Sequence, residues 1–493
     1  MNLVPPEILS EILSLLDPKT LLGCSTVCRT WHESIRDTPN LQYIIELWRD
    51  GLEPGYDGHL PVKECLNTLH QRRQAWRNIS WKCQKVIDIP GIQVCKAYEL
   101  VGGVLAVQER GAPNFCTLPL AELAVDSDTS VSTQVLPMEI DLENYLDFNM
   151  DPTQDLLVIL CQQEAGLRHI FFRTVSGLQP HPRALEPSII FTVNDEDLPG
   201  SLSIHIAEDL VAVSVLYPAQ VYIFKWQCAT LLANIRPPGR GTCFQFLSSR
   251  ALLLVSPEDE GRMEIHTISD DERGSVTHVA TLRLPTVASG WLISLIWLHS
   301  GPICGRAMHR RLFSSADTCH IYSFHVQYTK AHVAFWARLF VHHRTLRRYI
   351  SEYFRQECTP PTPIDVPWEE WGPDETRMLQ GDHRRWHRHV HGERVILPSN
   401  RASSLHVLDF SLSAAGAPVI SSDWPVDEMI LGPTTIEPHS ESPFESPVTT
   451  TLPFRSTLRD IPTRESFDQF LLEQDCVLGA DSQDPNKITV FVF

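Results

Sequence analysis

The runs "DLVAVSVL" (residues 209–216) and "QVYIFKW" (220–226) are short, rich in β-branched and aromatic residues, and separated by three residues that include a proline. Such a pair predicts two strands joined in a hairpin. The same pattern pairs "DLLVIL" (155–160) with "RHIFFRTV" (168–175), and "ALLLVS" (251–256) with "MEIHTI" (263–268). Further strand signals are "LVGGVLAVQ" (100–108) and "CHIYSFHV" (319–326). The long C-terminal part of the chain, residues 95–493, is therefore predicted to be all-β.

The hairpins recur about every 45 to 55 residues, a period found in β-propeller blades. The stretch "QVYIFKWQCATLLANI" (220–235) resembles the strand turn of a WD-type blade, with Trp226 near the usual tryptophan position and Gln227 in place of the usual aspartate. The chain ends in the apolar run "KITVFVF" (487–493), which could pair with the first blade and close a ring. We expect a propeller-like domain; a β-sandwich, or two sheets ending in an edge strand, is the alternative.

Two insertions interrupt the strand pattern, near residues 343–367 and 433–453. "HRTLRRYISEYF" (343–354) has apolar residues four apart, which predicts a short amphipathic helix, and "CTPPTPIDVP" (358–367) predicts an extended proline-rich connector. The segment 433–453 contains "HSESPFESPVTTTLP" and is interpreted as a flexible surface loop. Ser442 and Ser446 precede prolines there and are candidate phosphorylation sites, although a solvated loop without such a role is the simpler interpretation.

The composition is that of a folded globular protein, with 43% hydrophobic and 20% charged residues in 493. The formal net charge of −19 argues against a dedicated nucleic-acid binder, which needs a basic excess. No signal peptide or membrane-spanning run is recognised, so no membrane association is expected. The 13 scattered cysteines suit a reducing compartment better than a disulfide framework. We expect an intracellular protein, cytoplasmic or nuclear.

The N-terminal stretch "PPEILSEILSLLDPKTLLGCSTVCRTW" (5–31) has a different, helical period. Pro5 and the next proline suit a helix start, and apolar residues follow at helical spacing. Asp17 and Pro18 end this helix and begin another, as N-cap and first helical residue. Helices this short need a partner surface, because isolated helices below about 12–15 residues are marginal in water. The unit is either a cap on the rest of the chain or a docking module.

"VPPEILSEILSLLDPKTLLGCSTVCRTWHESI" (4–35) resembles the F-box motif: leucine-proline-x-glutamate, an apolar helix, aspartate-proline, a leucine pair, then valine-cysteine-x-x-tryptophan. Val4 stands where leucine usually precedes the proline. The resemblance implies a three-helix module that binds a Skp-type adaptor and, through it, a cullin–RING ubiquitin ligase. By position, the implied adaptor-binding residues are Val4, Pro5, Glu7, Ile8, Ile12, Leu16, Leu21, Val27 and Trp31. Pro5, Ile8 and Ile12 are favoured as contacts over Val27 and Trp31, because part of the set must fill the module's own core.

The resemblance and the change of period divide the chain into three parts: an F-box domain over 1–45, a helical connector over 46–94, and the β-propeller-like domain over 95–493. The connector contains an apolar helical stripe between residues 61 and 76. "LQYIIELWRDGL" (41–52) and "QAWRNISW" (74–81) also resemble, more weakly, segments that follow the F-box in many fungal F-box proteins.

Side chains that could perform chemistry are few. His387, His389 and His391 alternate in "DHRRWHRHVHGER" (382–394), which on a strand would place three imidazoles on one face, but four arginines in the cluster oppose a cation. A basic, polar blade edge is the favoured interpretation, and no metal or cofactor is expected. Arg344, Arg347 and Arg348 could attract an acidic partner but more simply form a solvated helix face. Glu369 and Glu370 are adjacent on an expected strand or loop and form a poor acid–base pair.

The function that these patterns favour is non-catalytic. The resemblance implies the substrate-recognition subunit of a Skp–cullin–F-box ubiquitin ligase, which binds the adaptor through its N-terminal helices and a target protein through its β domain. The alternative is a propeller-like ligand-binding protein or enzyme whose N-terminal helices are only a cap. An F-box protein that serves another assembly is a third possibility that the sequence leaves open.

Overall fold

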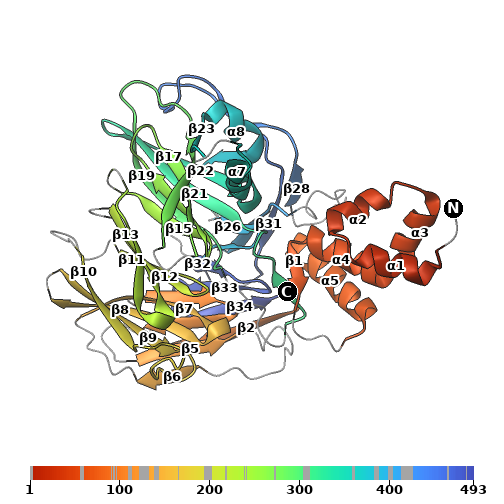
Figure 1. Cartoon of the computed structure of the whole chain (residues 1–493), viewed down its shortest axis with the longest axis horizontal. Coiled ribbons are helices and arrows are strands. Elements are labelled where there is room, and N and C mark those ends of the chain that lie inside the picture. The colour runs from red at the N-terminus through yellow and green to blue at the C-terminus, as the bar shows by residue number, and fades with distance from the viewer. Residues whose placement is uncertain are drawn as a thin grey trace.

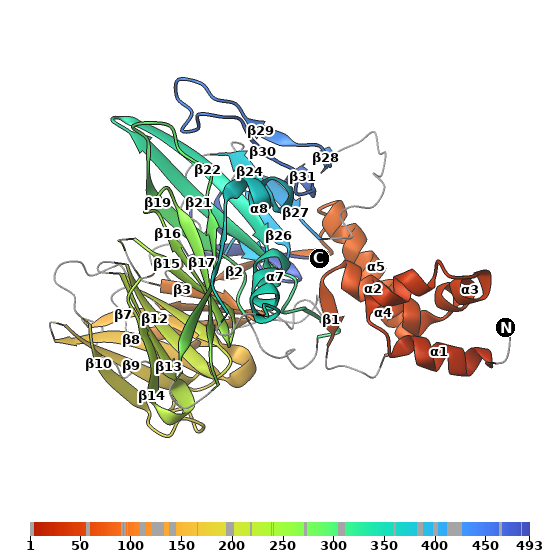
Figure 2. The same cartoon turned by 45° about the horizontal axis from the view of Figure 1, so that its top comes forward.

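A computed structural model shows a helical N-terminal region beside a large all-β domain (Figure 1). The structure describes residues 4–55, 60–89, 92, 95, 97–108, 114–120, 133–137, 144–164, 166–193, 202–216, 219–237, 239, 241–270, 274–303, 311–357, 361–381, 388–397, 403–411, 426–462, 466–484 and 486–493. Figure 2 shows the helical region as a separate lobe at one side of the β domain.

The helical region contains five helices and one short strand among the described residues. They are α1 (Pro6–Ser14), α2 (Pro18–Cys24), α3 (Arg29–Asp37), α4 (Pro39–Arg49), β1 (Leu52–Pro54) and α5 (Val62–Arg77). Three of these helices begin with a proline, which has no N–H to leave unsatisfied at that position. The expected connector helix is α5.

The β domain consists of seven antiparallel sheets of four or more strands among the described residues, here called blades 1 to 7. Blade 1 comprises β3 (Ala97–Val101), β4 (Val104–Gln108), β5 (Asn114–Pro119) and β6 (Gln134–Pro137). Blade 2 comprises β7 (Tyr145–Asp151), β8 (Leu156–Glu164), β9 (Leu167–Thr174) and β10 (Ser188–Thr192). Blade 3 comprises β11 (Leu202–Ala207), β12 (Leu210–Leu216), β13 (Ala219–Lys225) and β14 (Thr230–Ile235).

Blades 4 to 6 carry additional elements. Blade 4 comprises β15 (Cys243–Ser248), β16 (Ala251–Ser256), β17 (Arg262–Ile268) and β18 (Val276–Arg283), with β23 (Ile364–Val366) added in parallel to β18. Blade 5 comprises β19 (Leu292–His299), β21 (Ile321–Lys330), β22 (Val333–His342) and β24 (Thr376–Gln380). Blade 6 comprises β25 (Val390–His391), β26 (Arg394–Leu397), β27 (Ser404–Asp409), β31 (Phe454–Asp460) and β28 (Val426–Ile430).

Blade 7 joins the two ends of the domain. It comprises β32 (Phe467–Leu472), β33 (Cys476–Asp481), β34 (Lys487–Val492) and, outermost, β2 (Cys83–Asp88). The terminal run therefore closes the ring as expected, but it pairs with β2 in its own sheet and not with blade 1. β2 lies in the segment 46–94 that the sequence assigns to the connector, and its ladder with β34 makes it part of the β domain. The strand is only six residues long, has alternating polar residues and follows a predicted helix, so the sequence pattern did not reveal it.

Every pair of neighbouring blades encloses a cluster of buried apolar side chains, so the ring is closed by packing as well as by hydrogen bonds. Blades 1 and 2 enclose Phe115 and Phe148, for example, and blades 3 and 4 enclose Ile223 and Phe246. Other clusters lie between blades 2 and 3, 4 and 5, 5 and 6, and 6 and 7. Blades 7 and 1 share a cluster that includes Leu105 and Val490. The β domain is a seven-bladed propeller, which confirms the expected fold class.

The three hairpins of the opening pattern are β8–β9, β12–β13 and β16–β17. Trp226 lies in a short 3₁₀ turn between β13 and β14, fully buried, and its Nε1 donates to the carbonyl oxygen of Glu208 at 3.0 Å. This is the third-to-fourth strand turn of the blade, where the WD-type resemblance places it.

The first insertion contains α7 (His343–Phe354), the expected amphipathic helix, and α8 (Trp368–Glu375) follows it directly. Glu369 and Glu370 therefore lie in the exposed first turn of a helix, not on a strand or loop, because Pro367 and two acidic residues favour a helix start there. Trp368 and Trp371 of α8 are buried with their rings 5.5 Å apart, so this segment is an aromatic packing corner.

The second insertion differs from the expected flexible loop. β29 (Thr434–Ile436) and β30 (Val448–Thr450) pair, and the connection between them folds back on the propeller. Phe444 packs against Tyr328 and Phe335, which buries Ser442 beside it. Phosphorylation of Ser442 would require this packing to open, whereas Ser446 is exposed.

Candidate docking site

The helix α1 and the turn that ends it, which contains the C-cap Leu15 and Leu16, carry two apolar stripes on different faces. Leu9, Leu13 and Leu16 form the inner stripe and join a small core with residues of α2, α3 and α4, in which Leu13, Leu21, Ile35, Leu41 and Ile45 are buried. In this core α1 packs on α3 and α4. One apolar stripe is enough to hold a helix on its neighbours, so the second stripe calls for another explanation.

The outer stripe of α1 consists of Ile8, Ile12 and Leu15, whose exposed fractions are 46%, 51% and 85%. Their spacing of four and three residues places them on one side of the helix. Val4, 51% exposed, precedes the helix, and Val27, 65% exposed, lies between α2 and α3. Monomeric proteins seldom expose large apolar side chains in groups, and such groups mark interaction surfaces. These five residues are here called the outer face.

Local sequence signals hold the helices that present the outer face. The Asp17 carboxylate accepts hydrogen bonds from the backbone N–H groups of Lys19 and Thr20, at 3.1 and 3.0 Å, and caps α2. Hydrogen bonding to Thr20 lowers the pKa of this carboxyl. Asp17 and Pro18 thus fix the break between α1 and α2, as the sequence indicates.

The structure separates the residues that the motif resemblance implies into two groups. Val4, Pro5, Glu7, Ile8, Ile12 and Val27 are exposed. Leu16 and Trp31 are half-buried, and Leu16 packs against the helical core. Leu21 is fully buried in that core, which leaves it no free surface for a partner. Its place is a structural one, because it faces α4 from the inner side of α2.

The sequence reasoning did not single out Leu15, the most exposed apolar residue of α1. Its position seven residues after Ile8, almost two helical turns on, was the signal that could have found it. Val27 is also more exposed than Ile8 or Ile12, although the sequence ranked it as a weaker candidate. It lies just after the end of α2, where the apolar periodicity no longer shows which way a side chain points.

Residues 1–42 match the family model "F-box-like". The N-terminal helices form an F-box-like domain. The match covers α1, α2 and α3 together with the outer face and most of the inner core, and it ends within α4, before Ile45. No curated protein matches this chain.

Several solved structures share a likeness with the β domain at low identity. Kluyveromyces lactis Hsv2 with its complete loop 6CD is 12% identical, with a TM-score of 0.27, and covers 38% of this chain. The present chain spans 62% of the length of that protein. The same protein with loop 6CD replaced by a Gly-Ser linker gives 9% identity and a TM-score of 0.36 over 79% of this chain and 88% of that one. The β-propeller domain of Myceliophteria thermophila Cps50 (Swd1) is 11% identical, with a TM-score of 0.27. The match covers 52% of this chain and 85% of that one.

Helix α5 attaches the F-box-like domain to the propeller by buried ion pairs. Arg72 donates from Nε to the Asp475 carboxylate and from Nη2 to the Gln474 carbonyl oxygen, both at 2.7 Å, in the turn between β32 and β33. Arg73 pairs with Asp50 at the end of α4, at 2.8 Å. Burial alone would raise the pKa of Asp475, but the neighbouring Arg72 holds it below its ordinary value.

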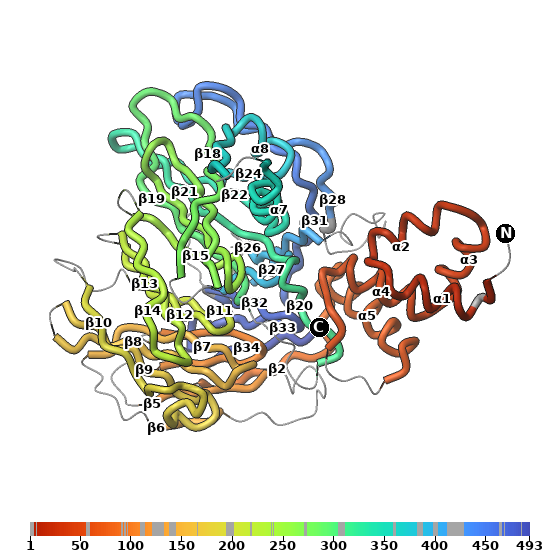
Figure 3. Tube along the Cα trace, in the orientation of Figure 1, coloured from red at the N-terminus to blue at the C-terminus, as the bar shows by residue number. Residues whose placement is uncertain are grey.

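An aromatic contact and a short sheet complete this junction. Trp76 of α5 stacks on the terminal Phe493, with ring centroids 4.0 Å apart and planes inclined by 7°. β1 pairs with β20 (Phe313–Ser315), which precedes β21 in the chain. Figure 3 shows the C-terminus beside α5, although the two segments are about 400 residues apart in sequence. The F-box-like domain is therefore held against blade 7 through side chains on both segments.

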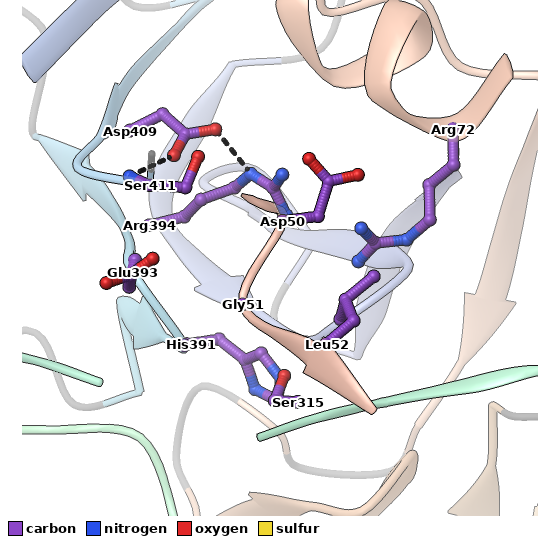
Figure 4. A pocket seen from close by; sticks show the side chains of 11 residues that line it. Asp50, Gly51, Leu52, Arg72, Ser315, His391, Glu393, Arg394, Asp409 and Ser411 are labelled. Carbon is purple, nitrogen blue, oxygen red and sulfur yellow. Dashed lines mark hydrogen bonds and ion pairs between the residues drawn. The ribbon is translucent and has the colours of Figure 1, made fainter. Parts of the chain in front are cut away.

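A small polar cavity lies in the junction (Figure 4). Its walls come from the end of α4, β1, α5 and blade 6, and include Asp50, Arg72, His391 and Arg394. Arg394 donates to Asp409 at 2.9 Å, and Ser315 lies 3.2 Å from the His391 ring nitrogen. The charged side chains are paired within the chain, so this cavity is a feature of the interface between the two domains.

The two described histidines of the alternating set, His389 and His391, do not lie together. His391 faces the junction, 3.9 Å from Glu473, whereas His389 packs against His299 and His325 in blade 5, with ring centroids 4.8 and 5.4 Å apart. His387 lies outside the described residues. Packing between neighbouring parts of the fold, and not the alternation of side chains along a strand, decides where these histidines point.

The basic helix α7 has a mixed outer face. Arg348 bonds to Glu375 at 2.7 Å, while Arg344 and Arg347 are exposed. Over the described ranges, no helix is long and apolar enough to span a membrane. No disulfide joins any of the described cysteines.

Proposed function

We propose that this protein is the substrate-recognition subunit of a Skp–cullin–F-box ubiquitin ligase, in which the outer face binds a Skp-type adaptor and the propeller binds a target protein. The observation that carries this proposal is the exposed stripe of Ile8, Ile12 and Leu15 in a domain of the F-box-like family. A mere cap would turn its apolar side chains toward the rest of the chain, whereas these three point away from the core that α1 shares with α3 and α4.

The proposed contact consists of Val4, Pro5, Glu7, Ile8, Ile12, Val27 and the added Leu15, with Leu16 and Trp31 at its edge. Apolar anchors at the centre of an interface contribute most of its binding free energy. Ile8 and Ile12 lie on successive turns of α1 within the outer stripe and are the proposed anchors. The role is non-catalytic, and a place in the cytoplasm or nucleus follows from the ligase to which the adaptor belongs.

The direct test is co-purification of the full chain with a Skp-type adaptor, followed by titration of the two proteins. The variant Ile8→Asp/Ile12→Asp places two charges where apolar contacts are required, and we expect it to lose binding by about a hundredfold or more. Leu185→Asp is the control, because Leu185 is an exposed apolar residue on the propeller, even more exposed than Ile8 and Ile12, and this variant should bind the adaptor as the wild type does.

Absence of binding by the wild-type chain, or equal binding by the double variant, would overturn the proposal and favour the cap. The ligase assignment has a second test. A complex of the chain and the adaptor should recruit the cullin–RING scaffold on size-exclusion chromatography. A ternary complex that excludes the cullin would place the protein in a different assembly.

A further inference from the structure

Three side chains with metal-binding atoms lie together on the outer half of blade 4. Glu264 and His266 belong to β17, and His278 belongs to β18. One oxygen or nitrogen of each lies within 4.8 Å of those of the other two. Residues two apart on a strand share a face, and His266 is directly opposite His278 in the ladder, so the three point to the same side of the sheet.

The distance between the two ligands on β17 suits coordination. The Nε2 atom of His266 lies 3.3 Å from Oε2 of Glu264. Two ligands that each bind a tetrahedral zinc ion at about 2.0–2.2 Å are about 3.3–3.5 Å apart. The rings of His266 and His278 stack with centroids 4.9 Å apart. The ladder shifts register between Ile265 and His266. A bulge of this kind changes the direction of nearby side chains.

Neighbouring residues hold two of the three groups in place. The Thr281 hydroxyl lies 3.0 Å from Nε2 of His278, and outer hydrogen bonds of this kind orient metal-binding histidines. Arg262 Nε lies 2.8 Å from Oε1 of Glu264, while Oε2 is the oxygen near His266. Arg262 is a cation near the site, but it also pairs with Asp259, which offsets its charge.

We propose that Glu264, His266 and His278 form a binding site for a divalent transition-metal ion, with Zn²⁺ as the best match. Two imidazoles and one carboxylate are the donor set that such ions prefer over Mg²⁺ or Ca²⁺. The side chains of His266 and Glu264 are 12% and 16% exposed, so an ion can reach them from solvent. Three protein ligands leave a fourth position for water or for a group of a bound partner.

The test is calorimetric titration of the untagged full chain with Zn²⁺ after removal of metals by a chelator. Free cysteine thiolates are zinc ligands in general, so the measured quantity is the difference between variants. We expect the wild type to bind one more equivalent than the variant Glu264→Gln/His266→Ala/His278→Ala. The single variants should weaken this equivalent at least about tenfold. His332→Ala removes an exposed histidine elsewhere and should leave the isotherm unchanged.

A second measurement distinguishes loss of the metal site from loss of folding in the triple variant. Glu264→Gln changes one ligand with little change in shape, and Zn²⁺ should raise the thermal unfolding midpoint of the wild type more than that of this variant. Co²⁺ absorption bands in the visible range should appear with the wild type and be lost with His266→Ala. Identical isotherms for the wild type and a folded triple variant would overturn the proposal, as would an equal effect of His332→Ala.

Discussion

The outer face of α1 and the inner face of α5 belong to the same helical region but have opposite chemistry. The outer face exposes aliphatic side chains such as Ile12 and Leu15, and nothing in the described chain covers them. The face of α5 that meets the propeller buries charges, with Arg72 paired to Asp475 across about 400 residues. Under the proposed function, a separate protein covers the outer face, whereas the face of α5 is covered by the same chain.

This difference has a physical reason. Two buried charges lose their hydration, and this loss is offset only if hydrogen-bonding geometry is good on both sides. A single chain can fix that geometry because both partners fold at once. A docking surface must be stable alone in water, and exposed apolar side chains remain available until a partner removes them from solvent. We therefore expect variants of the two faces to act on different measurable quantities.

The largest effect is expected at the buried junction. Arg72→Ala leaves Asp475 and its neighbours without their cation, and removal of one partner of a buried pair costs about 3–5 kcal/mol. The free energy of unfolding in urea measures it. Arg283→Ala, which breaks the exposed pair with Asp365, is the matched control and should cost about 1 kcal/mol or less. Similar losses of unfolding free energy in both variants would contradict the expected difference between the buried and the exposed ion pair.

A half-buried carboxyl beside a second carboxyl sharpens the comparison. Burial, and then the neighbouring Glu99, raise the pKa of Asp147 from 3.8 to about 7. Because the folded pKa is the higher one, this group stabilises the fold below pH 3.8, and the contribution is lost as the pH rises to about 7. The loss amounts to about 4 kcal/mol. In Asp147→Asn, the free energy of unfolding should decline less over this pH range than in the wild type. Urea titrations at several pH values measure it, and an equal decline in both proteins would refute the prediction.

Within the F-box-like domain, the two apolar stripes should respond differently to truncation. Leu21→Ala creates a cavity in the helical core and is expected to destabilise this domain by about 2–5 kcal/mol. Hydrogen exchange of the amides in α2 and α4 measures the local loss. Unchanged protection would mean that Leu21 is not a core residue.

The smallest effect on stability is expected on the outer face. Ile12→Ala removes an exposed side chain and should change the free energy of unfolding by no more than about 0.5 kcal/mol. The same variant should weaken adaptor binding by about tenfold or more, because an interface anchor is lost. If Ile12→Ala loses stability but retains adaptor binding, Ile12 is a core residue and not a contact residue.

Local sequence signals predicted much of this architecture. The hairpins, the Trp226 turn, the α1–α2 break at Asp17 and Pro18, and the terminal strand that closes the ring all depend on spacing within a few residues. Periodicity reports such spacing directly. The exposed residues Ile8 and Ile12 were also named, through the motif resemblance.

Other features depend on contacts between distant residues. Both stripes of α1 are apolar, so only its packing on α3 and α4 decides that Leu13 is inside and Leu15 outside. Phe444 turns an expected flexible loop into a packed connection that buries Ser442.

The sequence by itself determined the two kinds of unit and their order, because helical and strand periods are local properties of the chain. Only the tertiary structure decided which faces meet. β2 joins blade 7, His391 and His389 turn toward different blades, and Arg72 reaches Asp475 because ring closure brings the two ends of the propeller together. Such proximity arises from the summed packing of seven blades, and no short stretch of residues contains it.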